Sequence, residues 1–194
     1  MSTALSPAQK ARLTIEEFLA LPDDGTERWF VDGEIRPEER TMTRRSRDHT
    51  RVEAKVAYYL GDWLLHQPAP RGIVHSGEIG FRLRRDPDVL VGTDVAYASA
   101  ELVALADQEL PYYDGSPTLT VEILSPSDKH KDVVDKVRLY LAAGVVVWEI
   151  DPDFQVVHVH QPGRTTEVYS VNQEIDGTSY MPGLRVPIAA IFEV

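Results

Sequence analysis

The stretch from Thr118 to Asp151 constrains the fold more than any other part of the chain. It opens with TLTVEIL, a run of apolar and β-branched residues that is typical of a strand buried on both faces. Apolar residues at helical spacing follow from Lys129 to Ala143, with Ser127 as the predicted N-cap and Gly144 as the predicted stop. GVVVWEIDP is a second buried strand. A strand, a helix and a strand in this order predict a right-handed parallel crossover.

The preceding residues predict a helix, a hairpin and a longer helix. LTIEEFLAL (13–21) has a short helical pattern, and the Asp32-Gly33 pair predicts a hairpin over about 27–42. Ser46 is the predicted N-cap of a helix that runs to about His66, where prolines end it. These segments therefore place a long amphipathic helix directly before the strand-rich middle of the chain.

Strand patterns dominate the rest of the chain. In IVHSGEIGFRL (73–83), Gly77 and Gly80 predict a bend or bulge, and in DVLVGTDVAYAS (88–99) we expect Gly92 to interrupt the strand. QVVHVHQ, TEVYSV and GLRVPIAAIFEV predict further strands and a short last helix. The expected order is therefore helix, strand, strand, strand, helix and strand, with extra β-structure at both ends.

Length and composition indicate one soluble domain. The 194 residues suit a single domain, which we divide into an N-terminal helix and hairpin (1–45), a core (46–151) and a C-terminal β extension (152–194). No long apolar run or secretory signal pattern is present, so we expect a cytoplasmic protein with no membrane partner. The absence of cysteine leaves oxygen and imidazole ligands for any metal, and hard cations such as Mg²⁺ fit oxygen ligands best.

The formal net charge of -11 opposes binding to a polyphosphate. Two arginine-rich segments, 40–51 and 82–85, reduce this objection locally. We therefore expect contacts to nucleic acid from a small set of side chains, namely Arg44, Arg45, Arg47 and Arg82. The alternative is that these arginines form an ordinary solvated surface.

Two carboxylates attract attention because each lies within a predicted strand. Asp94 belongs to VGTDVAY and Glu122 to LTVEILSPSD. A buried charge is unfavourable by several kcal/mol unless it is paired or bound to a metal, so two acids on adjacent strands indicate a Mg²⁺ or Mn²⁺ site. The alternative is that each acid is satisfied separately by a backbone amide or an arginine.

Lys136 and Glu78 are the other candidate residues of this site. The predicted helix brings Lys136 back beside the strand that carries Glu122, where an ammonium group can stabilise a phosphate or orient a water. Alternatively, Lys136 is a solvated partner of Asp132 on its own helix. Glu78 lies on the strand signal before Asp94 and is a possible extra ligand, although an exposed edge position fits it equally well.

Seven segments in this order resemble one family. They are FVDGEI, GEIGFRL, TDVAY, LTVEILSPSD, DVVDKVRLYLAAGV, VWEIDP and MPGLRVPIAAIF, and they span about Leu13 to Val194. Together they resemble the Uma-type proteins, a bacterial family within the PD-(D/E)xK restriction-endonuclease-like superfamily. The resemblance implies an α/β (α+β) fold with an αβββαβ core, a mixed central sheet, an N-terminal helix and hairpin, and C-terminal β additions.

The resemblance also implies a metal-dependent phosphodiesterase site that acts on nucleic acid, with DNA as the expected polymer. Asp94 matches the acid of the PD motif, with Thr93 in place of its proline, and Glu122 matches the acid of the (D/E)xK motif. Leu124 occupies the usual lysine position, so Lys136 matches the displaced lysine. In the mechanism that we expect, Asp94, Glu122 and the main-chain carbonyl of Ile123 hold Mg²⁺ or Mn²⁺.

Other interpretations remain open at this stage. The acidic charge favours a catalytically weak or inactive nuclease-like fold that serves as a binding or regulatory module. A serine hydrolase built on Ser125 and His130 lacks a nucleophile elbow. His158 and His160 alternate on one strand face, but the sequence indicates no third metal ligand for them. We also expect a homodimer, because cleavage of both strands of a duplex needs two sites.

Overall fold

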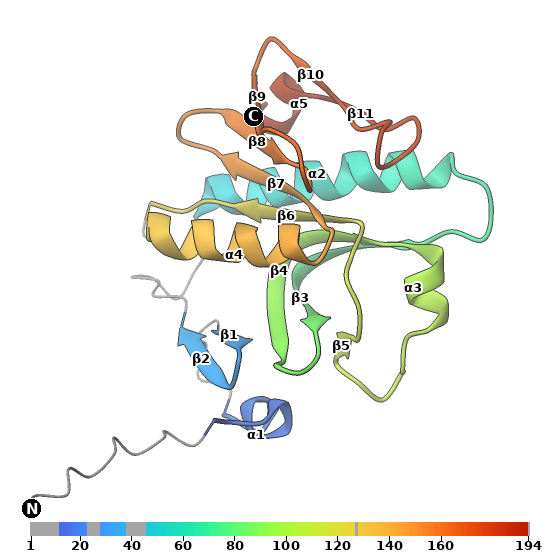
Figure 1. Cartoon of the computed structure of the whole chain (residues 1–194). Helices are drawn as coiled ribbons and strands as arrows, with labels where there is room; N and C mark the ends of the chain where they lie inside the picture. Colours follow the sequence, from blue (N-terminus) through green and yellow to red (C-terminus); the bar gives the residue numbers. More distant parts are fainter. Residues whose placement is uncertain (1–11, 23–27, 38–45, 127, 194) are drawn as a thin grey trace, which may run out of the picture.

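The computed structural model describes residues 12–22, 28–37, 46–126 and 128–193. Its helices are α1 (Ile15–Leu19), α2 (Arg47–Leu65), α3 (Ala100–Ala104), α4 (His130–Ala142) and α5 (Ile188–Phe192). Its strands are β1 (Arg28–Val31), β2 (Glu34–Pro37), β3 (Ile73–Arg84), β4 (Val89–Ala98), β5 (Tyr112–Tyr113), β6 (Leu119–Ile123), β7 (Val146–Asp151), β8 (Val156–His160), β9 (Glu167–Ser170), β10 (Glu174–Asp176) and β11 (Arg185–Pro187). Helix α1 and the β1–β2 hairpin lie at one end of the molecule, and α5 with β10 and β11 lies at the other (Figure 1).

The main sheet is mixed. Its strands follow the order β2-β1-β4-β6-β7-β8-β9, with β3 beside β4 and the short β5 beside β3. Strands β6 and β7 are parallel, whereas the β4–β6 and β7–β8 pairs are antiparallel. The parallel pairing expected from the 118–151 segment is therefore confirmed. The elements α2, β3, β4, β6, α4 and β7 form the αβββαβ core that the sequence resemblance implied.

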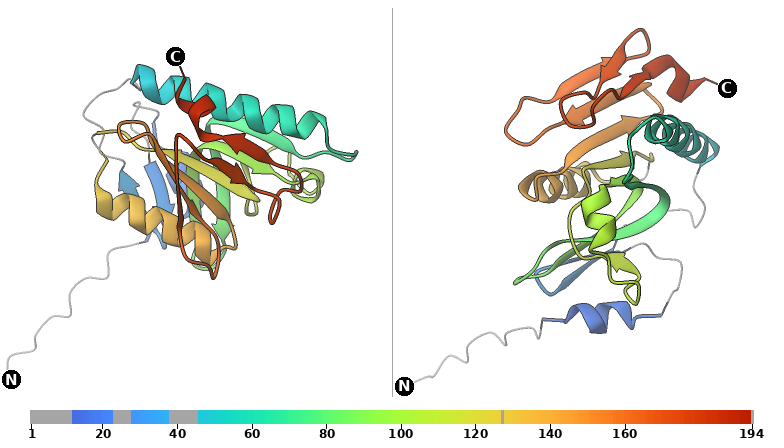
Figure 2. Two further views of the ribbon diagram at one scale, coloured as in Figure 1. Left: turned by 90° about the horizontal axis from the view of Figure 1, so that it is seen from above. Right: turned by 90° about the vertical axis from the view of Figure 1, so that its right-hand side faces the viewer.

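Helices α2 and α4 cover opposite faces of the central strands (Figure 2). Under α2, side chains such as Val56, Val121 and Trp148 belong to one large apolar cluster. On the other face, Val137 and Tyr140 of α4 pack with Val147. Because β6 is covered on both sides, most side chains on both of its faces are apolar, and this explains the pattern of TLTVEIL, which Glu122 interrupts.

Two local predictions about helix starts have opposite outcomes. Helix α2 begins where expected, because the Ser46 side chain accepts a hydrogen bond from the His49 amide at 3.1 Å. The prediction of Ser127 as the N-cap of α4 is wrong: the N-cap is Lys129, which makes no side-chain capping bond, and Ser127 lies outside the described residues. Asp128 instead accepts from the Ser125 amide at 2.7 Å, so a turn precedes the helix. Within the described ranges, no helix has the length and apolarity needed to cross a membrane.

The predictions for the glycines of β3 and β4 also have opposite outcomes. The register between these strands shifts from Ser76 to Ile79, which confirms the bulge predicted near Gly77. The expected interruption at Gly92 is wrong, because β4 is continuous from Val89 to Ala98. Gly92 pairs with Gly80 in that ladder, and a Cβ atom on Gly92 would lie 2.9 Å from Glu78 Oε2. Gly92 therefore allows a close approach within a regular strand.

Candidate active site

Along one edge, strand β4 pairs first with β1 and then with β6. The candidate site lies between these two pairings. The first residues of β4 pair with β1 at Val89 and Leu90, whereas its pairing with β6 begins at Val95. Between these ladders, side chains satisfy main-chain groups. Asp94 Oδ2 accepts a hydrogen bond from the Ile123 amide at 2.8 Å, and the Tyr140 hydroxyl lies 3.0 Å from the Gly92 carbonyl. Asp94 thus continues the contact between β4 and β6 beyond the regular ladder.

Glu122 faces α4 and has two partners on that helix. Lys136 Nζ donates to Glu122 Oε2 at 2.7 Å, and the Tyr140 hydroxyl donates to Glu122 Oε1 at 2.8 Å. Lys136 and Tyr140 are one helical turn apart, so α4 presents both groups to the same carboxylate. Lys136 is buried, so the alternative of a solvated lysine is wrong. Burial of these groups is compensated by charge and hydrogen bonding.

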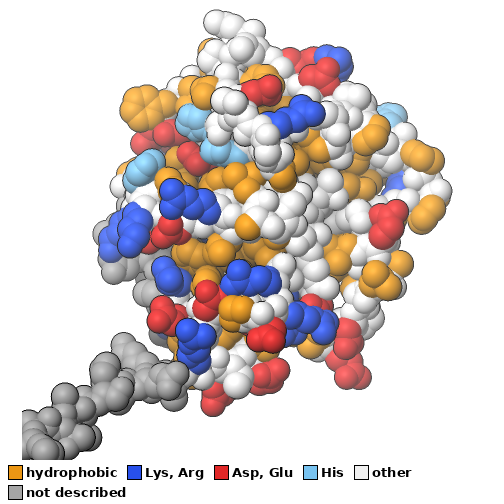
Figure 3. Space-filling model, viewed as in Figure 1, with side chains coloured by type: hydrophobic (Ala, Val, Ile, Leu, Met, Phe, Trp, Pro, Cys, Tyr) orange, Lys and Arg blue, Asp and Glu red, His pale blue; other side chains and the backbone are white. Residues whose placement is uncertain are grey.

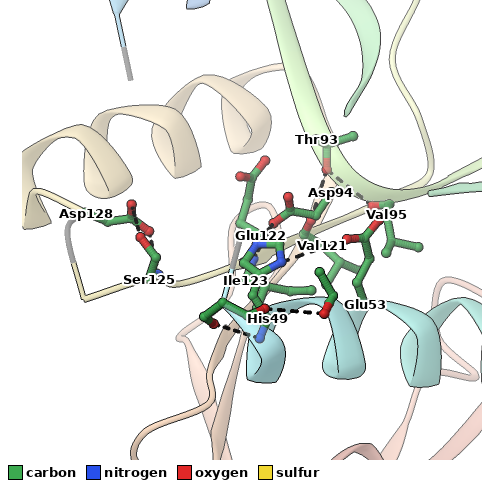
Figure 4. A network of polar contacts seen from close by, with 12 residues as sticks. His49, Glu53, Thr93, Asp94, Val95, Val121, Glu122, Ile123, Ser125 and Asp128 are labelled. Atoms are coloured by element: carbon green, nitrogen blue, oxygen red, sulfur yellow. Dashed lines mark hydrogen bonds and ion pairs between the residues drawn. The ribbon is translucent and has the colours of Figure 1, made fainter. Parts of the chain in front are cut away.

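Asp94, Glu122 and Lys136 line one pocket. Its remaining lining residues are Trp29, Ile123, Leu124, Asp128, Lys129, Asp132 and Val133. Figure 4 shows Asp94 and Glu122 in the space between α2 and α4. Among the described residues, no three histidine, aspartate or glutamate side chains are arranged closely enough to hold an ion without adjustment. The structure nevertheless brings together the three polar residues that the sequence singled out.

Tyr140 is a hydrogen-bond donor that sequence analysis missed. Its side chain is completely buried. Burial raises the pKa of Tyr140 well above its ordinary value, and the negative charge of Glu122 raises it further. The phenol therefore keeps its hydrogen and holds Glu122 in place. Sequence analysis assigned Tyr140 to the apolar helix face, and only its spacing of four residues from Lys136 could have indicated this role.

His49 and Glu53 are further residues that sequence analysis missed. They lie on the first turns of α2, four residues apart, and both side chains face Asp94 in Figure 4. His49 Nε2 is 3.3 Å from Asp94 Oδ2, and His49 Nδ1 is 3.8 Å from Glu53 Oε2. The available signal was a histidine and a glutamate at helical spacing next to the Ser46 cap.

Glu78 does not line this pocket. It lies in the β3 bulge with a φ of 57° and is exposed, with its carboxylate near Gly92. Positive φ is uncommon for a residue with a side chain, and the bulge accounts for it. The position is adjacent to the site through Gly92, whose carbonyl lies 3.0 Å from the Tyr140 hydroxyl.

The arginines proposed for nucleic-acid binding lie in different surroundings. Arg47 is exposed at the start of α2. Arg82 donates to Asp88 at 2.9 Å and lies 3.7 Å from Asp114, so acids neutralise it. Arg44 and Arg45 lie outside the described residues. On the face shown in Figure 3, basic and acidic side chains are interspersed.

The structure also describes the surroundings of the two alternative sites, one at Ser125 and one at His158 and His160. The Ser125 hydroxyl donates to Asp128 Oδ1 at 2.7 Å, which gives Ser125 a role in the turn before α4. His158 Nδ1 and His160 Nε2 each lie 3.4 Å from a carboxylate oxygen of Glu149. Figure 3 shows histidine side chains gathered on this face of the molecule. The two histidines therefore have an acidic neighbour that the sequence did not indicate.

Comparisons with known proteins identify the family and support the fold. The sequence model of the Uma2 family, described as "Putative restriction endonuclease", matches residues 15–189. A solved structure described as "a putative nuclease belonging to DUF820", from Anabaena variabilis, has 21% sequence identity and a TM-score of 0.76. The alignment covers 93% of this chain and 97% of that one, and it supports the fold alone. No curated protein matches the chain. The chain belongs to the Uma2 family of restriction-endonuclease-like proteins.

Proposed function

We propose that this protein is a metal-dependent endonuclease that hydrolyses phosphodiester bonds of DNA. One observation supports the proposal most strongly: Asp94, Glu122 and Lys136, which come from separate elements, line the same pocket. Two acids and one ammonium group suit a reaction in which negative charge grows on a phosphate. The family description adds support, because it names restriction endonucleases.

The donor set of the pocket fits a hard divalent cation. Asp94 and Glu122 supply carboxylates, and Ile123 lines the same pocket, where its main-chain carbonyl is a further oxygen donor. A carboxylate has about four lone-pair sites, so Glu122 retains acceptor capacity beside Lys136 and Tyr140. These three residues would hold Mg²⁺ or Mn²⁺. The bound ion supplies Lewis acidity and lowers the pKa of a water molecule.

Protein groups perform the remaining steps of the proposed mechanism. Lys136 donates hydrogen bonds to a phosphate oxygen and offsets the charge that develops there. Tyr140 keeps Glu122 oriented through its hydrogen bond of 2.8 Å. Asp94 is held by the Ile123 amide, which fixes the orientation of its carboxylate. Asp94 is buried and the Glu122 side chain is only 12% exposed, which strengthens these electrostatic interactions.

Phosphate binding outside the pocket is assigned first to Arg47. This arginine is exposed and lies on the same turn of α2 as His49, whereas Arg82 is engaged by Asp88. Arg44 and Arg45 remain proposed contacts beyond the described residues. A homodimer is proposed for double-strand cleavage, because one site cuts one strand at a time. A linear product from supercoiled plasmid without accumulation of nicked circles is the expected result for a dimer.

The test is cleavage of supercoiled plasmid, linear duplex, single-stranded DNA and RNA by the full chain with Mg²⁺, Mn²⁺ or EDTA. We expect cleavage of DNA that EDTA abolishes and that Asp94→Asn reduces by at least about a hundredfold. Glu149→Gln is the matched control, since Glu149 pairs with Glu122 in the β6–β7 register but does not line the pocket. Equal activity in Asp94→Asn and the unaltered protein would exclude the proposal.

The second candidate function is a non-catalytic binding module with a nuclease-like fold. The observation that favours it is the acidic charge of -11, which weakens attraction to nucleic acid. It predicts metal binding or partner binding without cleavage of any nucleic acid in the same assay. Cleavage that depends on Asp94 would eliminate this candidate.

A further inference from the structure

His49 is a buried histidine next to an acid of the candidate site. Only 2% of its surface is exposed, although it lies in the first turn of α2. Its ring stands between two carboxylates, with Nε2 at 3.3 Å from Asp94 Oδ2 and Nδ1 at 3.8 Å from Glu53 Oε2 (Figure 4). The helix therefore carries a titratable ring into the same region as Asp94, and the mechanism above does not use it.

The hydrogen bonding of this ring is incomplete. Among the described residues, neither His49 nitrogen has a hydrogen-bond partner with acceptable geometry, despite the nearby carboxylates. A buried polar atom without a partner destabilises the folded state. Buried polar groups are satisfied in the great majority of cases, and an exception calls for a functional reason or a bound ion. Simple packing does not account for an imidazole at this position.

The ring of His49 has one acid beside each nitrogen, Asp94 near Nε2 and Glu53 near Nδ1, and the 3.8 Å to Glu53 is longer than a hydrogen bond. Histidines that bind metals usually direct their second ring nitrogen toward a carboxylate, which sets the tautomer and the ring orientation. Glu53 has the position of that carboxylate. Two ligand atoms about 2.1–2.2 Å from one octahedral ion are separated by about 3 Å, close to the 3.3 Å between His49 Nε2 and Asp94 Oδ2.

We propose that His49 is a metal ligand through Nε2, that Glu53 orients its ring, and that the site consequently prefers Mn²⁺ to Mg²⁺. This inference rests on the proposed metal site of Asp94 and Glu122. Mg²⁺ favours oxygen ligands and retains several waters, whereas an imidazole nitrogen favours first-row transition ions. His49 and Asp94 form the prearranged pair, and Glu122 contributes from the α4 side of the pocket.

Calorimetric titration of the full chain with Mn²⁺ and with Mg²⁺ is the first test. We expect the unaltered protein to bind Mn²⁺ at least about tenfold more tightly than Mg²⁺. His49→Gln should weaken Mn²⁺ binding by about tenfold or more and Mg²⁺ binding much less. Glu53→Gln should weaken Mn²⁺ binding by about tenfold while retaining the ligand. His75→Gln is the matched control, because the ring of His75 contacts Tyr113 rather than an acid of the candidate site.

Pulsed electron paramagnetic resonance of bound Mn²⁺ is the second test, and it does not depend on catalysis. We expect coupling to an imidazole nitrogen in the unaltered protein, in Glu53→Gln and in His75→Gln, and its loss in His49→Gln. Thermal unfolding by circular dichroism establishes that each variant is folded. If His49→Gln does not fold, Glu53→Gln provides the affinity test and the unaltered protein provides the spectrum.

The outcomes separate this inference from the proposed function. Mn²⁺ binding without nitrogen coupling, or with unchanged affinity in folded His49→Gln, would overturn the role of His49 and leave the carboxylate site intact. A protein that binds neither ion would overturn both. Nitrogen coupling that depends on His49 in a protein without nuclease activity would support the inference and contradict the proposed endonuclease.

Discussion

Lys136 Nζ lies 2.7 Å from Glu122 Oε2, and the two side chains are only 10% and 12% exposed. This ion pair connects α4 to β6, so it is a structural contact as well as part of the candidate site. Breaking such a buried pair leaves an uncompensated charge, whereas an exposed pair contributes little. Stability and proposed catalysis are therefore coupled at this position.

Lys136→Met should lower the free energy of unfolding by about 3–5 kcal/mol, because Glu122 loses its buried counter-charge. Urea denaturation followed by circular dichroism measures the change. The double variant Glu122→Gln with Lys136→Met should be more stable than the sum of the single changes predicts. Additive effects in this cycle would show that the two groups do not interact in solution.

Tyr140→Phe should reduce stability by about 1–3 kcal/mol, because the charged Glu122 carboxylate loses a hydrogen-bond donor at Oε1. Burial raises the pKa of Tyr140 in the folded protein, so its stabilising contribution is present below the ordinary value of 10.0 and declines as the pH rises above it. Stability should therefore fall less steeply above pH 10 in Tyr140→Phe than in the unaltered protein. Identical alkaline profiles in denaturant titrations would contradict this.

Two replacements of Asp94 should separate its effect on stability from its effect on cleavage. Asp94→Asn keeps an oxygen that can accept from the Ile123 amide, whereas Asp94→Ala leaves that amide without its side-chain partner. We expect Asp94→Ala to be less stable than Asp94→Asn by about 1–3 kcal/mol, while both lose metal-dependent cleavage. Thermal unfolding together with the plasmid assay checks this. Equal stability of the two variants would mean that the 2.8 Å contact contributes nothing.

Glu149→Gln should alter the pH dependence of stability. Burial alone would raise the pKa of Glu149, but contacts with His160 and the charges of His158 and His130 outweigh it and lower the pKa. A lowered folded pKa gives stability that is present above the ordinary value of 4.5 and is lost as the pH falls through the folded pKa. The unaltered protein should therefore exceed Glu149→Gln above pH 4.5, by up to about 1 kcal/mol, and the difference should disappear in acid. Denaturant titrations from pH 3 to pH 7, with Glu174→Gln as an exposed control, measure it.

Arg47→Ala and Arg82→Ala should differ in DNA binding. Exposed Arg47 can neutralise a phosphate, so its removal should lower the slope of log affinity against log salt concentration by about 1. Arg82 is held by Asp88, so its removal should leave that slope unchanged. Fluorescence anisotropy with labelled duplex at several salt concentrations measures both. A larger slope change for Arg82 than for Arg47 would place the binding surface at Arg82 instead.

The core of the fold could be predicted because its signals are local. The Ser46 cap, the helical spacing after it and the apolar run of β6 each depend on neighbouring residues, and the structure confirms them. The start of α4 could not be predicted, since both Ser127 and Asp128 have capping chemistry. Asp128 instead stabilises the turn with Ser125, and the helix begins after Lys129.

The candidate site was predictable only in part. Asp94 and Glu122 stood out as acids within apolar strands, and the position of Lys136 followed from the length of the crossover. His49 and Tyr140 did not stand out, because each occupies a helix face whose pattern suits packing. Similarly, His158 and His160 lacked a third neighbour until strand pairing placed Glu149 opposite His158.

The sequence by itself determined which segments become helices and strands and which polar residues must be buried, since periodicity, caps and composition act over a few residues. Only the tertiary structure decided which of these residues meet. The contact of His49 with Asp94 depends on the pairing of segments that are distant in the chain. The same is true of β1 and β6, which pair with different parts of β4. Local patterns carry no record of such pairing, because it results from packing the whole sheet between α2 and α4.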